Sequence, residues 1–222
     1  MISRSTTFRV TIASVILIIA AGLSAALLAQ DNATSEPNVQ RSDVFSFSDG
    51  SQVEDAFAQL TRFDNGATMA ISTSDLQEGD VYTVWWVIFN APENCSDGVC
   101  DADDLLVVED GVVPRDESGN RVMNMEGIEA TNASLIHAAG GYATDGTLNT
   151  SASLGEGSVA GILLGPGLLD AETAEIHLVV RTHGPADETS FAEQLSTFGG
   201  GCEPMDAPPC DDVQYAIFTP PM

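Results

Sequence analysis

Only three histidines occur in this chain of 222 residues, and they are its most versatile side chains for catalysis or metal binding. They are His137, His177 and His183, and three imidazoles could together hold a copper or zinc ion. The chain contains neither His-x-His nor His-Glu-x-x-His, the spacings that bring two imidazoles to one metal. We therefore expect ordinary hydrogen-bonded histidines, with a His-ligated metalloenzyme as an alternative.

Acidic side chains are densest in the segment 93–126. The candidate cation ligands within it are Asp97, Asp101, Asp103 and Asp104. Ca²⁺ prefers six to eight oxygen ligands of the kind that such carboxylates supply. The EF-hand pattern, with its glycine and terminal glutamate at fixed positions, is absent. In so acidic a chain a solvated acidic loop needs no ion, so that interpretation is favoured. A Ca²⁺-dependent adhesion or ligand-binding module is the alternative.

Four cysteines form two close pairs in the sequence, Cys95 with Cys100 and Cys202 with Cys210. An even number in an exported chain predicts two disulfides, although the sequence alone allows three pairings. Turn-forming residues lie between the members of each pair, which favours pairing in sequence order. A zinc site is disfavoured because neither pair has Cys-x-x-Cys spacing and no histidine is near.

The charge balance excludes several classes of function. The chain has 33 Asp and Glu, 7 Arg and no Lys, for a net charge of −26. Nucleic acids and anionic membrane surfaces require a positive surface, so neither is an expected partner. The lack of lysine excludes P-loop, Schiff-base and Ser-x-x-Lys chemistry.

The same composition is typical of halophilic proteins from strongly saline sources. Like charges repel one another in the folded state, and the screening length falls to about 3 Å at 1 M salt. We therefore expect the melting temperature to rise from low salt to molar NaCl.

The first 29 residues have the pattern of an export signal. Arg4 and Arg9 precede an apolar run over 10–29, which ends in small residues. The run approaches the length of a membrane span, so an uncleaved anchor is the alternative to a cleaved signal peptide. Cleavage removes two arginines and no acid, leaving 33 acids against 5 arginines, a net charge of −28. The expected location is secreted or at the cell surface, with membrane contact only through an uncleaved N-terminal segment.

The remaining sequence predicts a flexible tether over 30–43 and a single all-β domain over 44–222. Alternating apolar residues predict strands near 68–72, 174–181 and 213–217, and shorter candidates lie at 105–108, 134–143 and 147–154, the last at a sheet edge. Short helices are candidates at 53–60 and 190–198. Many short strands between Gly, Asp and Pro turns indicate an antiparallel β-sandwich with one or two short helices.

Residue parity predicts which side chains share a face of the sheet. In the run 82–90, apolar residues occupy both odd and even positions, as in a strand covered on both faces. Its adjacent Trp85 and Trp86 must point to opposite faces. In the strand near 174–181, Glu175, His177, Val179 and Arg181 share one face, and His183 continues it. We therefore expect the two histidines and Arg181 on a common, polar side of the sheet.

Several segments together resemble one protein family. They are Thr83–Cys95, Ala174–Pro185, Gly199–Cys202 and Cys210–Gln214. The set resembles a family of exported prokaryotic β-sandwich proteins with no assigned activity, and it spans roughly residues 65–218. It is also loosely similar to chordin-type domains, but the His-x-His signature of those domains is missing here. The resemblance implies an extracytoplasmic domain with two disulfides and supplies no catalytic residues.

Together these patterns predict a non-enzymatic β-sandwich, secreted or at the cell surface, with a binding or structural role. We expect no catalytic residue, and no cofactor apart from the Ca²⁺ of the alternative above.

Overall fold

A computed structural model describes residues 36–221, so the expected signal peptide over 1–29 lies outside the described residues. Within this range one sheet has the strand order β6-β3-β2-β1-β9-β8-β4-β5-β7, and neighbouring strands are antiparallel. The strands are β1 (Asn38–Ser46), β2 (Gln52–Phe63), β3 (Gly66–Thr73), β4 (Asp80–Phe89), β5 (Ala133–Tyr142), β6 (Leu148–Gly155), β7 (Ile162–Leu164), β8 (Glu175–Pro185) and β9 (Asp211–Phe218). The helices are η1 (Pro92–Asn94), η2 (Ala102–Asp104), α1 (Met125–Ala130) and α2 (Phe191–Gln194). The prediction of an antiparallel all-β fold with few helices is confirmed.

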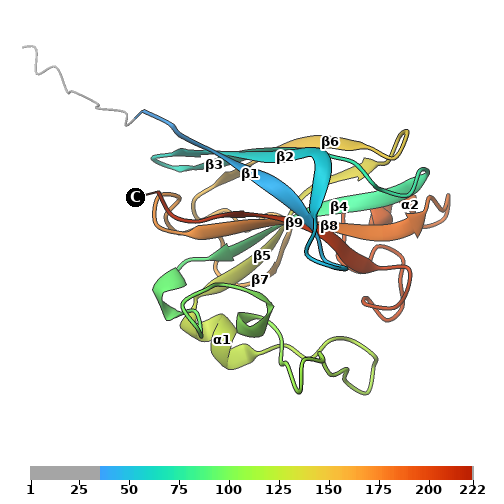
Figure 1. Cartoon of the computed structure of the whole chain (residues 1–222). Coiled ribbons are helices and arrows are strands. Elements are labelled where there is room, and N and C mark those ends of the chain that lie inside the picture. The colour runs from blue at the N-terminus through green and yellow to red at the C-terminus, as the bar shows by residue number, and fades with distance from the viewer. Residues whose placement is uncertain (1–35, 222) are drawn as a thin grey trace, which may run out of the picture. The chain divides into compact units, whose positions relative to one another are not determined.

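The sheet curls so that its two halves face each other as layers (Figure 1). β6, β3, β2 and most of β1 form the first layer, and β9, β8, β4, β5 and β7 form the second. β1 belongs to both, since its residues 38–43 pair with β2 while Phe45 and Ser46 pair with β9. The register shifts between Asp43 and Phe45, and such an irregularity bends a strand. The two layers are therefore parts of one sheet.

The core fills the space between the layers. Leu60 and Met69 of the first layer join Trp86 and Leu178 of the second in one buried cluster. Trp85 is also buried but lies on the opposite face of β4, as its parity predicts. β4 is buried at every position after Asp80, which confirms that both of its faces are covered.

Three expectations about local structure are wrong. Residues 38–43 are not part of a tether, because they pair with β2 and Gln40 accepts a hydrogen bond from buried Arg62 at 2.7 Å. The helix candidate 53–60 is part of β2, in which alanines occupy inward positions and weaken the apolar alternation. The segment 105–108 forms only an isolated bridge between Leu106 and Met123. The short helix expected within 190–198 is present as α2, and β6 is the edge strand expected at 147–154.

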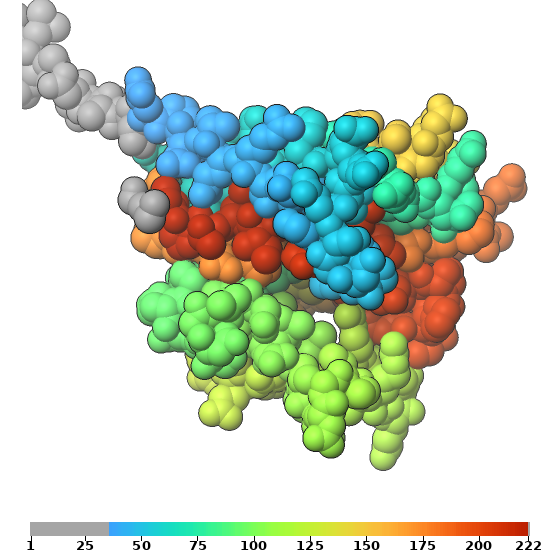
Figure 2. All heavy atoms as spheres, in the orientation of Figure 1, coloured from blue at the N-terminus to red at the C-terminus, as the bar shows by residue number. Residues whose placement is uncertain are grey.

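The outer face of the second layer is covered by two long segments, which Figure 2 shows in green and in orange to red. The covering segment 91–132 holds α1 and the disulfide Cys95–Cys100, and Ile128 packs there against Val87 and Phe89 of β4. The covering segment 187–210 holds α2 and the disulfide Cys202–Cys210. Both disulfides join cysteines in sequence order, as predicted. None of the helices within residues 36–221 has the length and hydropathy of a membrane span.

Candidate functional site

All three histidines are on the outer face of the second layer, and each has its own partner. His183 Nε2 lies 2.7 Å from Thr83 Oγ1, and His177 Nε2 lies 2.8 Å from Glu175 Oε1. His137 Nε2 is 3.0 Å from the carbonyl oxygen of Leu195. The described residues contain no group of three or more His, Cys, Asp or Glu side chains arranged to hold a metal ion. The three histidines are therefore not brought together as the metalloenzyme alternative requires.

His183 is the most enclosed of the three, with 2% of its surface exposed. Burial, and then the positive charge of Arg181, lower its pKa to about 4. Gly200 has a φ of +48° and packs so closely that an added Cβ would overlap the imidazole ring. Trp85 Nε1 donates to the same Thr83 hydroxyl at 2.7 Å. The imidazole thus serves as a neutral, hydrogen-bonded packing group beneath the covering segment 187–210.

Arg181 lies beside His183 in a network of ion pairs. Its guanidinium contacts Asp206 and Asp212 at 2.8 Å each, and Arg121 contacts the same two carboxylates at 3.0 and 2.9 Å. Although burial opposes it, the charges of Arg121 and Arg181 hold the pKa of Asp206 below its usual value. Because Arg121 and Asp206 belong to the two covering segments, the network fastens both of them to β8 and β9.

Sequence reasoning placed Arg181 with the histidines but missed the other three members of this network. One signal was available, since the sequence after residue 29 has only five arginines and 33 acids. A buried arginine in such a chain is expected to have carboxylate partners. The sequence does not show which acids they are.

Three of the four predicted calcium ligands use their carboxylates within their own loop. Asp104 is 2% exposed and accepts hydrogen bonds from the backbone amides of Ser96 at 2.9 Å and Asp101 at 3.1 Å. Asp101 Oδ1 accepts from the amide of Asp103 at 2.8 Å, and Asp97 Oδ1 accepts from that of Val99 at 3.0 Å. Burial raises the pKa of Asp101, although the bond from Asp103 opposes this. These three carboxylates are therefore bonded to backbone amides, and within residues 36–221 the four acids do not form a group arranged to hold a metal ion.

A groove of about 800 Å³ lies between the turn 46–52, the start of β9 and the covering segment 91–132. Phe47 and Leu106 give it apolar walls, while Arg121 and Asp212 line it with groups already paired to each other. In Figure 2 the groove lies below the blue turn and above the green segment. Arg121 and Asp212 are members of the ion-pair network, and the other charged residues of the lining are the acids Asp49, Asp75, Asp80 and Asp211. This groove is therefore acidic, like most of the chain, and is a secondary candidate.

The first layer presents a different outer surface, which we call the open face. It consists of the outward-pointing residues of β1, of β2 from Phe57 onward, of β3 and of β6. They are Val39, Arg41, Asp43, Phe57, Gln59, Thr61, Phe63, Thr68, Ala70, Ser72, Asn149, Ser151 and Ser153. Arg41 and Asp43 are its only charged members, and their charges cancel, because the exposed acids Glu54 and Asp55 of β2 lie before Phe57 and outside the open face. Gln59, Ala70 and Ser151 are among its exposed residues.

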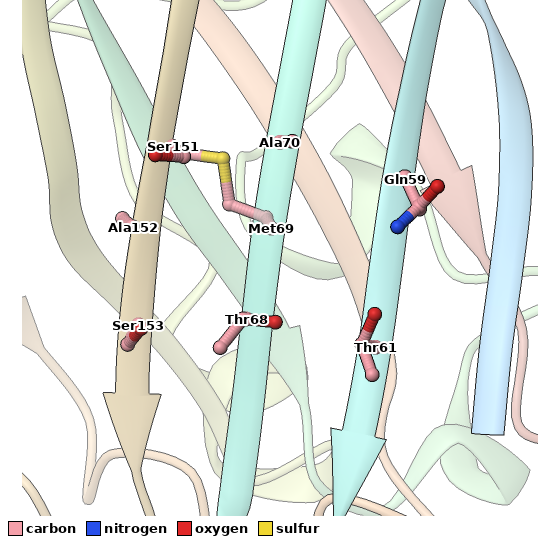
Figure 3. Close-up of a pocket in the computed structure, with 8 residues that line it drawn as sticks. All are labelled: Gln59, Thr61, Thr68, Met69, Ala70, Ser151, Ala152 and Ser153. Atoms are coloured by element: carbon pink, nitrogen blue, oxygen red, sulfur yellow. The ribbon is translucent and has the colours of Figure 1, made fainter. Parts of the chain in front are cut away.

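Regular strand pairing arranges the open face in rows, and Figure 3 shows its central part. The registers from β2 to β3 and from β3 to β6 are unbroken. One row is therefore Thr61, Thr68 and Ser153, and the next is Gln59, Ala70 and Ser151. These rows line a shallow depression of about 540 Å³.

Phe63 ends the row of outward positions on β2. Its partners across the sheet are Gly66 and Gly155, which have no side chains. A Cβ on Gly66 would lie 2.3 Å from the carbonyl oxygen of Leu154, so glycine is required for the close approach of β3 to β6. The ring of Phe63 is thus flanked by bare backbone and is partly exposed.

Comparison with known proteins does not identify a relative: no family model, curated protein or solved structure matches the chain. Any functional assignment therefore rests on the two outer faces of the sheet.

Proposed function

We propose that this chain is an exported, acidic binding domain, secreted or held at the cell surface, and that the open face contacts its ligand. The observation that carries the proposal is a surface without net charge on a chain of net charge −26. Exposed acids keep such a protein soluble, and single-sign charge also opposes close association with partners. A face without net charge is where a ligand approaches with the least electrostatic cost.

Export is supported by two features. The sequence has a leader pattern over 1–29, and the described domain contains two disulfides, which persist in oxidising compartments outside the cytoplasm. The proposal assigns no catalytic residue, because the histidines and arginines of the covered face have packing and ion-pairing roles in the fold.

Two added acids test the proposal without removing any contact. Ala70→Glu with Ser151→Glu places two negative charges in neighbouring positions of the open face. Val112→Glu with Val159→Glu is the matched control, since these residues are 66% and 61% exposed and lie outside the open face. The measurement is co-sedimentation of the exported chain with cell-envelope material of the producing organism in molar NaCl.

We expect the wild type and the control pair to co-sediment with the envelope material, and the open-face pair to remain in the supernatant. The proposal would be overturned if the open-face variant and the control variant bind equally well, or if the wild type does not bind.

A further inference from the structure

We infer that the ligand of the open face is an uncharged carbohydrate chain, bound across β2, β3 and β6. This inference rests on the proposed function and specifies the chemistry of its ligand.

The first observation is a set of hydrogen-bonding side chains that the fold does not use. Within residues 36–221, these side chains form no hydrogen bond to another protein group. They are Gln59, Thr61, Thr68, Ser151 and Ser153. Hydroxyls in several surface turns are engaged, as in Thr189 to Asp187 at 2.6 Å and Ser51 to Asp49 at 2.7 Å. Each free hydroxyl can donate once and accept twice, and the amide does both. A sugar hydroxyl has the same dual capacity.

The second observation is the position of the aromatic rings. Phe57 and Phe63 lie on the outward side of β2, on either side of Gln59 and Thr61. Six residues of strand separate the two phenylalanines by about 20 Å. Arg41 covers Phe57, with its Cζ 3.9 Å from the ring centroid, whereas Phe63 is bordered by glycine backbone. Because a sugar ring has an apolar face of C–H groups, it can pack on Phe63 while its hydroxyls reach the adjacent polar rows.

Charge favours an uncharged ligand over the other candidates. An anionic polymer is repelled by the net charge of −26, and a cationic ligand is attracted to acidic surface elsewhere before it is attracted to a face without net charge. A second copy of the chain carries the same repulsion, and the central rows lack the large apolar side chains found at the centre of stable dimer interfaces. Hydrogen bonding with ring stacking does not need charge attraction and so persists at high salt.

Selective destruction of the envelope material identifies the ligand class. Periodate cleaves the vicinal diols of sugars, whereas protease digestion removes proteins. In the co-sedimentation assay we expect periodate treatment to abolish binding and protease treatment to leave it unchanged. Loss of binding after protease but not after periodate would overturn the carbohydrate inference. The proposed function would still stand if the open-face acid pair also prevented that binding.

Substitutions on the open face test the proposed contacts. Thr61→Val with Thr68→Val removes two hydroxyls from one row while keeping the size of the side chains, and Phe63→Ala removes the partly exposed ring. We expect each to lower the affinity for envelope material at least tenfold, and Phe47→Ala, on the 46% exposed ring of the turn 46–52, to leave it unchanged. Equal losses for Phe63→Ala and Phe47→Ala would contradict the assignment, as would a concentration-dependent dimer that these substitutions dissociate.

Discussion

Two arginines stack on phenylalanine rings at the same distance, one on each outer face of the sheet. Arg181 lies over Phe198 and Arg41 over Phe57, each with its Cζ 3.9 Å from the ring centroid. Arg181 is fully buried and contacts two carboxylates, while Arg41 is exposed and has no ion pair within residues 36–221. The same pair of residue types therefore stabilises the fold on the covered face and remains accessible on the open face.

The contrast extends to the polar groups of the two faces. Among the described residues, no buried side-chain nitrogen or oxygen lacks a hydrogen-bond partner. Among the groups best suited to chemistry, His137, His183 and Arg181 contact the covering segment 187–210, and His177 pairs with Glu175 within β8. The hydroxyls of the central rows of the open face form no side-chain hydrogen bond within residues 36–221, which is why we propose that a ligand uses them.

The largest expected effect on stability comes from replacing Arg181, and the matched comparison is the same replacement of Arg41. Arg181→Leu leaves Asp206 and Asp212 with one cationic partner and removes donors to the carbonyl oxygens of Phe198 and Met205. We expect it to lower the free energy of unfolding by about 3–5 kcal/mol, measured by urea denaturation in molar NaCl. Arg41→Leu should change it by less than about 0.5 kcal/mol.

Arg181→Lys keeps the charge without the planar fork of donors and should lose part of this stability, which gives a readout if Arg181→Leu does not fold. If Arg181→Leu and Arg41→Leu lower the free energy of unfolding by similar amounts, the proposed difference between the covered face and the open face is wrong.

The disulfides come next, because each closes a loop in a covering segment. Replacing both cysteines of one pair by serine should cost about 2–3 kcal/mol, given sequence separations of 8 for Cys202–Cys210 and 5 for Cys95–Cys100. Cys210 also packs against His183, so its pair should give the larger loss. The comparison is made by urea denaturation of the two double variants. A larger loss for Cys95–Cys100 would contradict the role given to the covering segment 187–210.

The pH dependence of stability reports on His183. In the unfolded chain its pKa is near 6.5, and in the folded protein it is about 4, so the unfolded chain binds more protons between these values. The free energy of unfolding should therefore fall as the pH decreases from about 6.5 to about 4, by on the order of 2 kcal/mol. His183→Gln should reduce this slope in parallel urea titrations. An unchanged slope would show that His183 is not the group responsible.

The smallest effect on stability is expected on the open face. Ala70→Glu with Ser151→Glu should change the free energy of unfolding by less than about 0.5 kcal/mol per site in molar NaCl, because both residues are exposed and form no side-chain hydrogen bond. Thermal or urea unfolding of the variant beside wild type checks this. A loss of several kcal/mol would mean that the open face contributes to folding.

The sequence was informative wherever side-chain periodicity was strong. The two-sided apolar run of β4 and the alternation in β8 correctly placed Trp85, Trp86 and His177 on their faces. Polar β1 was missed because its inward Gln40 is satisfied by Arg62, a partner 22 residues away. The open face was missed for a related reason. Its rows join residues of β2, β3 and β6, and only the register of distant strands brings them together.

Oxidative footprinting of exposed side chains tests the central claim most directly. Hydroxyl radicals label solvent-accessible phenylalanine and methionine. The partly exposed Phe63 therefore reports on the open face, while Phe47 and Met125 report on the groove and the covering segment 91–132. With envelope material bound, we predict that oxidation of Phe63 falls relative to that of Phe47 and Met125. Protection of Phe47 or Met125, with Phe63 oxidised as in the free protein, would contradict the account.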